Sequence, residues 1–140
     1  PSVCWLIEIG DDVTLAPGVR IFAHDASMHR ALGYGRIAPV VIGRGTFIGA
    51  NSVVLPGVTI GKNCVIGAGS IVAADIPDGM VAAGNPCKPI IPTFDFIEKH
   101  RSRLKTSPKF DQSYTIQHGV NEKKKAEMKK ALKGKSGYLR

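Results

Sequence analysis

A strict six-residue repeat runs from Ile42 to Pro77, and it limits the possible folds more than any other feature of the chain. An aliphatic residue occupies every sixth position: Ile42, Ile48, Val54, Ile60, Ile66 and Val72. Four residues after each of these comes a small or β-branched residue: Thr46, Ser52, Val58, Cys64, Ser70 and Ile76. Gly, Asn, Pro and Asp fill many of the positions between. A fixed period of this kind indicates a repeat architecture.

The period of six is incompatible with both a regular helix and a flat strand. At about 100° per residue, positions i and i+6 of an α-helix point in different directions, and the repeated glycines also disfavour a helix. In a flat strand residues i and i+2 share one face, yet the i+2 position holds Arg44 and Lys62. The chain must therefore turn a corner within each hexapeptide, at Gly, Asn or Asp residues that tolerate φ > 0.

Short strands that alternate with tight corners wind into a parallel β-helix. If three hexapeptides form one coil, the aliphatic residues stack in pairs: Ile42 on Ile60, Ile48 on Ile66 and Val54 on Val72. Successive coils would lie about 4.8 Å apart and share backbone hydrogen bonds. Burial of the aliphatic rows is then the main stabilising contribution, at roughly 25 cal/mol per Å² of apolar area.

The repeats, together with the closing segments 75–77 and 81–88, resemble the hexapeptide-repeat acyltransferases. The chain is most similar to the galactoside, maltose and capsular-polysaccharide O-acetyltransferases, over about residues 7–92. The resemblance implies an all-β domain, a left-handed parallel β-helix shaped as a three-sided prism, which departs from the usual right-handed crossover. It also implies a homotrimer with active sites between subunits. We expect this domain to span residues 1–92, with a loop excursion at residues 24–41.

Hexapeptides of the same kind, in another frame, precede the excursion. They are Ile9–Thr14 and Leu15–Arg20, with Val13 and Val19 at the i+4 positions. An uncovered first coil would expose a sheet edge. We therefore expect that residues preceding Pro1, or another element, cover that edge.

The excursion between Ile21 and Ile42 is the candidate functional segment. These two residues are twenty-one positions apart, so the frame of six breaks between them. An insertion in a regular scaffold often carries functional side chains. This one contains two of the four histidines, and His24 lies at its base, where the scaffold fixes geometry best.

The resemblance implies that His24 is a general base. Family members have a catalytic histidine at the start of such a loop, directly after a hexapeptide. Acetyl transfer to a hydroxyl requires removal of the alcohol proton as its oxygen attacks the thioester, and a neutral imidazole suits that role. The His24-Asp25 pair is more similar to the polysaccharide-modifying branch than to the His-Pro pair of the galactoside branch. The alternative is a loop histidine with a purely structural hydrogen bond.

The remaining loop residues are expected to contact the acceptor. We predict substrate-binding roles for Asp25, Tyr34 and Arg36, and Asp25 is also a candidate to orient the imidazole. A zinc site is a weaker alternative, because His24-x4-His29 has the spacing of two ligands in β-helical carbonic anhydrases. In those proteins a third histidine comes from an earlier coil. No histidine precedes His24 in this sequence, so we expect no metal.

By the same resemblance, acetyl-CoA lies along an edge of the prism, in a groove between subunits. The backbone near Gly49 and Ala50 would donate a hydrogen bond to the thioester oxygen in the transition state. The backbone of Ala68 would contact the pantetheine arm. Lys88 would contact the nucleotide end of the cofactor.

Two further cofactor-binding positions, Ala73 and Ala74, depart from the family pattern. The family commonly has Val-Thr-Lys-Asp where this chain has Val-Ala-Ala-Asp at residues 72–75. The change removes side-chain contacts, including one positive charge near the cofactor phosphates. The alternative role of both alanines, and of Ala68, is steric, since small residues keep neighbouring coils close.

Residues 93–140 are predicted to form a basic C-terminal helical extension. Thr93 and Asn121 are the expected N-caps of two helices, the second ending near Leu132. Of the net charge of +8, residues 99–140 contribute +10, from thirteen Lys/Arg against three Asp/Glu, and the other 98 residues contribute −2. This basic face is either solvated or attracts an anionic polymer, a lipid-linked sugar phosphate or the cofactor phosphates. We expect no nucleic-acid binding, because aromatic residues are few and no recognition module is present.

The cysteines and the hydropathy pattern bear on the cellular location. Three cysteines at irregular spacing fit neither a disulfide framework nor a zinc site, and Cys64 occupies an inward position of the repeat. No stretch is apolar enough for a signal peptide or a membrane span. We therefore expect a cytoplasmic enzyme.

These features together predict an acetyl-CoA-dependent O-acetyltransferase that acts on a sugar or polysaccharide hydroxyl. Transfer would be direct, in a ternary complex, with His24 as the base. One alternative is an N-acetyltransferase of nucleotide-linked amino sugars or of xenobiotics on the same scaffold. The other is a non-enzymatic β-helical scaffold or binding protein.

Overall fold

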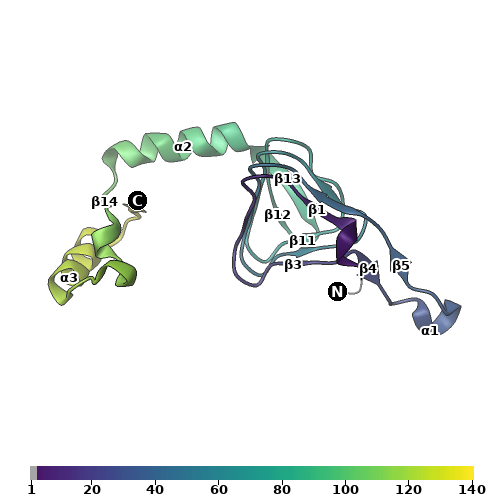
Figure 1. Cartoon of the computed structure of the whole chain (residues 1–140). Helices are drawn as coiled ribbons and strands as arrows, with labels where there is room; N and C mark the ends of the chain where they lie inside the picture. Colours follow the sequence, from purple (N-terminus) through teal and green to yellow (C-terminus); the bar gives the residue numbers. More distant parts are fainter. Residues whose placement is uncertain (1–2) are drawn as a thin grey trace. The chain divides into compact units, whose positions relative to one another are not determined.

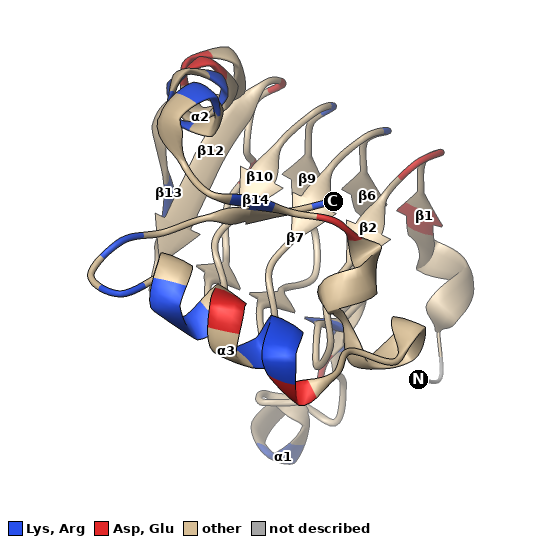
Figure 2. Ribbon diagram, turned by 90° about the vertical axis from the view of Figure 1, so that its left-hand side faces the viewer, with Lys and Arg blue, Asp and Glu red and all other residues tan. Residues whose placement is uncertain are grey.

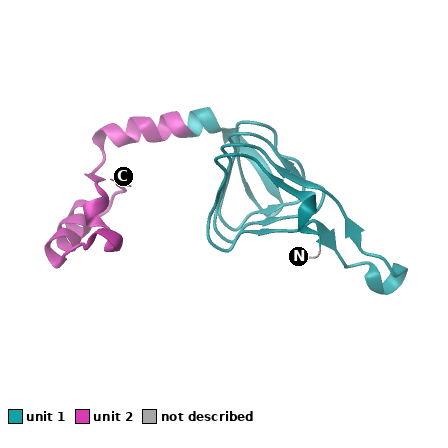
Figure 3. Ribbon diagram, in the orientation of Figure 1, with its two compact units in different colours: residues 1–96 teal, residues 97–140 magenta. Residues whose placement is uncertain are grey.

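The computed structural model describes residues 3–140. The chain separates into two compact units, Pro1–Phe96 and Ile97–Arg140 (Figure 3). The first unit contains the parallel sheets and the loop excursion, and the second contains most of the helical residues. Each unit is described separately below.

Unit 1 is built from short strands, after a 3-10 turn, η1 (Cys4–Leu6). The strands of its three main sheets are β1 (Ile7–Ile9), β2 (Thr14–Leu15), β3 (Arg20–Ile21), β6 (Val40–Ile42), β7 (Phe47–Ile48), β8 (Val53–Val54), β9 (Thr59–Ile60), β10 (Val65–Ile66), β11 (Ile71–Val72), β12 (Met80–Gly84) and β13 (Cys87–Pro92). The strand orders are β1-β6-β9 in sheet A, β13-β12-β10-β7-β2 in sheet B and β11-β8-β3 in sheet C. All neighbours are parallel except the antiparallel pair β12–β13.

The chain passes through sheets A, B and C in turn and then returns to sheet A, one strand further along (Figure 1). Strand pairing places Ile42 beside Ile60, Ile48 beside Ile66 and Val54 beside Val72. These are the pairs that a coil of three hexapeptides predicts. The parallel three-sheet arrangement and the stacking by eighteen residues are therefore confirmed.

The corners between sheets use the residues that tolerate a left-handed backbone. Positive φ values between 52° and 85° recur every six residues on each side of the excursion, at Asp12 and Gly18 before it and at Gly45, Asn51, Gly57, Asn63 and Gly69 after it. Gly adopts this conformation at low cost because it has no Cβ, and Asn and Asp tolerate it because their short polar side chains can hydrogen-bond locally. The predicted use of Gly, Asn and Asp at the corners is confirmed.

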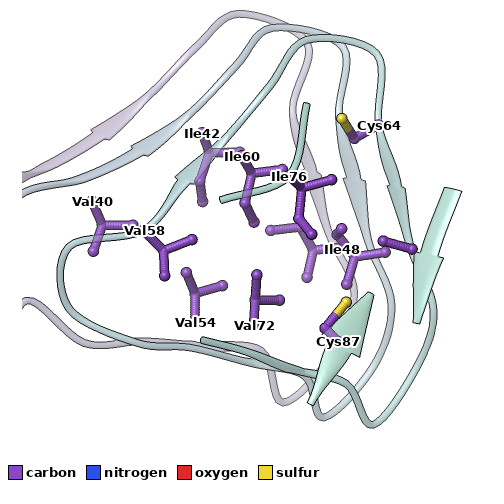
Figure 4. Close-up of a cluster of buried hydrophobic side chains, with 12 residues drawn as sticks. Val40, Ile42, Ile48, Val54, Val58, Ile60, Cys64, Val72, Ile76 and Cys87 are labelled. Atoms are coloured by element: carbon purple, nitrogen blue, oxygen red, sulfur yellow. The ribbon is translucent and has the colours of Figure 1, made fainter. Parts of the chain in front are cut away.

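The aliphatic rows form the core of unit 1 (Figure 4). All six residues of the aliphatic series are at most 1% exposed: Ile42, Ile48, Val54, Ile60, Ile66 and Val72. Cys64 is fully buried, as predicted from its position in the repeat. Cys87 is also buried, and burial raises the pKa of its thiol, although a hydrogen bond with Ser70 opposes the shift. Both cysteines are therefore core residues.

Buried hydroxyl groups add hydrogen bonds between the coils. The Thr46 hydroxyl donates to the Gly61 carbonyl at 2.8 Å and accepts from the Cys64 N–H at 3.0 Å. The Ser52 hydroxyl likewise donates to Gly67 O at 3.1 Å. These small polar residues are fully buried, so each hydroxyl satisfies backbone groups that would otherwise be desolvated without a partner.

We expect Thr46→Val to lower the free energy of unfolding by about 1–3 kcal/mol, because it leaves the Cys64 N–H without its hydroxyl acceptor at almost unchanged volume. Urea denaturation monitored by circular dichroism measures the change. The matched control is Thr59→Val, whose side chain is exposed on β9 and should shift the free energy by less than about 0.5 kcal/mol. Equal effects of the two variants would contradict the stabilising role of the hydrogen bond between the Cys64 N–H and the Thr46 hydroxyl.

The loop excursion leaves the coils after β3 and rejoins them at β6 (Figure 1). It contains β4 (His24–Asp25), a single helical turn α1 (His29–Leu32) and β5 (Arg36–Ile37). Strands β4 and β5 form an antiparallel ribbon. The ribbon closes at its base, where the Ala38 N–H donates to the Ala23 carbonyl at 3.0 Å.

The C-terminal part of the chain is mainly helical. Its elements are α2 (Thr93–Thr106), β14 (Lys109–Phe110), η2 (Gln112–Tyr114), η3 (Ile116–His118), α3 (Glu122–Ala131) and β15 (Tyr138–Leu139). Asn121 caps α3 as predicted, since its side chain accepts from the Lys124 N–H at 2.9 Å. Lys and Arg outnumber acidic residues on α3 (Figure 2). Within residues 3–140, no helix has the length and hydropathy needed to cross a membrane.

Candidate active site

His24 lies on β4, at the base of the loop. It pairs with Ile37 across the ribbon, next to the pair Asp25–Arg36. The preceding residue, Ala23, is only 3% exposed, whereas the His24 side chain is exposed. The buried base thus holds the backbone of His24 while its imidazole remains accessible.

Asp25 caps the turn that leads into the loop. Its Oδ1 accepts from the Ser27 N–H at 2.8 Å. This hydrogen bond, with further help from the Ser27 side chain and from Arg36, holds the pKa of Asp25 below its usual value. Asp25 is therefore a carboxylate at neutral pH. In the part of the chain described here, no hydrogen bond joins its carboxylate to His24, so its predicted role in orienting the imidazole stays a prediction.

Arg36 ties the ribbon to the coils. Its Nη1 donates to the Pro56 carbonyl at 3.1 Å, and Pro56 belongs to the corner that follows β8. The Arg36 residue as a whole is exposed. Tyr34 is 79% exposed.

A pocket of about 330 Å³, which we call the loop-base pocket, brings three of the predicted residues together. Its lining residues are Phe22, His24, Asp25, Ala26, Arg36, Leu55 and Pro56. An imidazole, a carboxylate and a guanidinium beside an aromatic ring are suited to a polyhydroxylated ligand, which needs several hydrogen bonds and an apolar contact. Tyr34 does not line this pocket.

Four lining residues were not predicted as site residues: Ala26, which lies within the excursion, and Phe22, Leu55 and Pro56, which lie outside it. Phe22 and Leu55 directly follow inward aliphatic residues, and the Phe22 N–H donates to the Val54 carbonyl at 2.9 Å. Phe22 and Leu55 become neighbours because the coil before the excursion pairs with the coil after it, as Ile21 does with Val54. This pairing cannot be counted from the sequence, because the excursion interrupts the period of six.

Three of the predicted cofactor-binding residues stack at the corner between sheets B and C. The Gly49 N–H donates to the Ile66 carbonyl at 2.8 Å, and the Gly69 N–H donates to the Ala50 carbonyl at 2.8 Å. A Cβ at position 49 would lie 2.5 Å from the Ala68 nitrogen, so this corner requires glycine. Since the Gly49 N–H is engaged, the candidate oxyanion donor is the Ala50 N–H, which has no partner within residues 3–140.

Lys88 lies near the same corner. It is on β13, paired with Ala83 of β12, and a Cβ added at Gly67 would come within 2.8 Å of the Ala83 Cβ. The candidate oxyanion donor and the candidate contact for the nucleotide end therefore belong to one edge of the unit.

Ala73 and Ala74 lie at a different corner, after sheet C. The Leu55 N–H donates to the Val72 carbonyl at 3.0 Å, so these alanines follow Leu55 and Pro56 by one coil. Both are exposed. This is the corner at which the excursion departs, and it is therefore also the corner of His24.

Within one chain, the candidate base and the candidate oxyanion donor thus occupy different corners. His24 precedes sheet A in the coil and Ala50 precedes sheet C, with a strand of sheet C between the two corners. No cluster of three or more His, Cys, Asp or Glu side chains suited to a metal occurs among the residues that the structure describes.

Comparison with known proteins identifies the family. The family model "Bacterial transferase hexapeptide (six repeats)" matches residues 39–74. Protein CapG of Staphylococcus aureus is 41% identical over 124 residues, which cover 86% of this chain and 67% of CapG. The chain belongs to the hexapeptide-repeat transferase family.

Solved structures identify the group within the family. A maltose O-acetyltransferase from Clostridium difficile 630 is 48% identical, with a TM-score of 0.57, over 61% of this chain and 48% of that one. A galactoside acetyltransferase in complex with coenzyme A is 43% identical, with a TM-score of 0.61, over 66% of this chain and 48% of that one. The chain spans about half the length of these two proteins. Both of these solved relatives are sugar acetyltransferases, one of maltose and one of galactosides.

Proposed function

We propose that the protein is an acetyl-CoA-dependent O-acetyltransferase that acts on a sugar or polysaccharide hydroxyl, built on a left-handed parallel β-helix. The observation that carries the proposal is the loop-base pocket, in which His24 shares a cavity with Asp25, Arg36 and Phe22. The similarity to maltose and galactoside acetyltransferases supports the reaction, and the coenzyme A bound to the latter supports the donor.

In the proposed mechanism, His24 accepts the proton of the acceptor hydroxyl as its oxygen attacks the thioester carbonyl. The backbone N–H of Ala50 stabilises the oxyanion of the tetrahedral intermediate. Collapse of that intermediate breaks the carbon–sulfur bond, and the His24 imidazolium returns the proton to the CoA thiolate. Asp25 and Arg36 hold the acceptor by hydrogen bonds. Ala68 and Lys88 contact the donor, and Ala73 and Ala74 leave room for it.

We further propose a homotrimer in which each site combines His24 of one copy with the Ala50 corner of a neighbour. Two observations support this. The two groups lie at different corners of one chain, and sheet B carries an outward row of apolar residues in register, Phe47, Val65, Val81 and Ile91. Phe47 is 42% exposed in the single chain, so a neighbouring copy would bury apolar area there.

The function is tested by incubating the protein with acetyl-CoA and a panel of hydroxyl and amine acceptors, with release of the CoA thiol as the readout. Transfer to sugar hydroxyls is expected. Transfer only to amines would favour the N-acetyltransferase alternative. Absence of coenzyme A binding in calorimetry would favour the non-enzymatic scaffold.

Mixing experiments test the shared site. We expect His24→Ala chains and Ala68→Trp chains to be inactive alone, because one lacks the base and the other blocks the donor groove at an exposed corner. Co-expressed chains should recover about one quarter of wild-type activity, since a random pair of neighbours supplies both intact groups with that probability. Activity no higher than that of the separate variants would place both groups in one copy.

A further inference from the structure

The imidazole of His24 lies across the ribbon, over Gly35. His24 pairs with Ile37, so Gly35 is its diagonal neighbour on the same face of the ribbon. A Cβ added to Gly35 would lie 2.5 Å from His24 Nε2 and 3.2 Å from His24 Cδ2. A real Cβ cannot approach a ring nitrogen so closely, so the observed ring position requires the absence of a side chain at residue 35.

The requirement for glycine at position 35 is steric and does not come from the backbone. Gly35 is not among the residues with positive φ, so alanine can adopt its conformation without strain. Gly33 in the same loop differs, because it has φ of 72° as the C-cap of α1 and open space around its Cα. The two loop glycines therefore serve different purposes.

The ribbon itself has little freedom to accommodate a side chain at Gly35. The next residue, Arg36, is held by the Pro56 carbonyl at 3.1 Å, and the ribbon base closes through Ala23 and Ala38. An added Cβ would also lie 3.1 Å from the Asp25 carbonyl oxygen. The exposed imidazole is the part that can move, by rotation about its side-chain torsions.

We propose that Gly35 is a positioning residue for His24, which it keeps in the loop-base pocket by leaving the space that the imidazole occupies. This inference rests on the proposed function, in which His24 is the base. A side chain at position 35 displaces the ring from the attacking hydroxyl, and a displacement of about 1 Å in such a geometry is worth up to 100-fold in rate.

The test is a graded series, Gly35→Ala and Gly35→Val, in the full chain. We expect kcat to fall about 10-fold for alanine and further for valine, with an unchanged KM for acetyl-CoA and an unchanged or higher Tm. In the His24→Ala background, the same substitutions should cause no further loss. Ala31→Ser, on the exposed surface of α1 in the same loop, is the control and should retain wild-type kcat.

A second readout is independent of turnover. In NMR spectra, Gly35→Ala should shift the imidazole resonances of His24 and leave those of His100 and His118 in place. Unshifted His24 resonances, or a Gly35→Val variant with wild-type kcat, would overturn the positioning role. If His24→Ala retains full turnover while the resonances shift as expected, the proposed function fails and the steric relationship stands.

Discussion

Replacing His24 with alanine should lower kcat for acetyl transfer by about 10²–10⁴-fold, the usual contribution of a general base. The physical reason is that the acceptor hydroxyl must lose its proton as it attacks, and His24 supplies the imidazole among the residues that line the loop-base pocket. Asp25 lies in the same pocket, but its lowered pKa makes it a weaker base than an ordinary carboxylate. Steady-state kinetics with the best acceptor of the panel, at saturating acetyl-CoA, measures the loss.

His29→Ala is the matched control for this variant. His29 lies on α1 in the same excursion and is exposed, but it does not line the loop-base pocket, so its variant should retain wild-type turnover. Calorimetry should show undiminished binding of coenzyme A to the His24→Ala protein, because the donor contacts lie at other positions. Full turnover by His24→Ala would refute the assignment of the base.

The second large effect concerns the core. Ile60→Ala should lower the free energy of unfolding by about 2–5 kcal/mol, through lost transfer free energy and the cavity left behind. Ile60 is fully buried and lies between Ile42 and Ile76 in one aliphatic row. Neighbouring coils hold the cavity open on both sides, so the structure has little scope to collapse into it. Chemical denaturation measures the loss.

A graded substitution separates this cavity effect from general damage to the strand. Ile60→Val removes one methylene and should cost about 0.5–1.5 kcal/mol. Thr59→Ala, on the outward face of the same strand, should cost less than about 0.5 kcal/mol. If Thr59→Ala destabilised the protein as much as Ile60→Ala, the assignment of inward and outward faces would be wrong.

The repeat made most of unit 1 predictable from sequence. A period of six fixes which residues point inward, and three hexapeptides per coil fix that Ile42 lies beside Ile60 and Val54 beside Val72. The corner residues follow from the same frame, because only Gly, Asn or Asp suit a left-handed backbone at that spacing. The N-cap of α3 was also predictable, since Asn is one of the few residue types preferred at that position.

The arrangement of the candidate site was less predictable because the excursion breaks the frame. Strand pairing sets Ile21 beside Val54 and Ile9 beside Ile42, a separation that includes the whole loop and cannot be counted from the hexapeptides alone. Contacts inside the loop, such as His24 over Gly35 or Arg36 on the Pro56 carbonyl, follow no period. They depend on side-chain directions that only the folded ribbon reveals.

The closed base of the ribbon has a consequence for how such proteins diversify. Because Ala23 and Ala38 are hydrogen-bonded neighbours, the excursion leaves the coils and rejoins them at nearly the same point. Insertions, deletions and substitutions in the loop beyond this point need not disturb the stacking of the coils. Under the proposed function, new acceptor preferences can therefore evolve in the outer part of the loop while the coils and the candidate base, His24, stay unchanged.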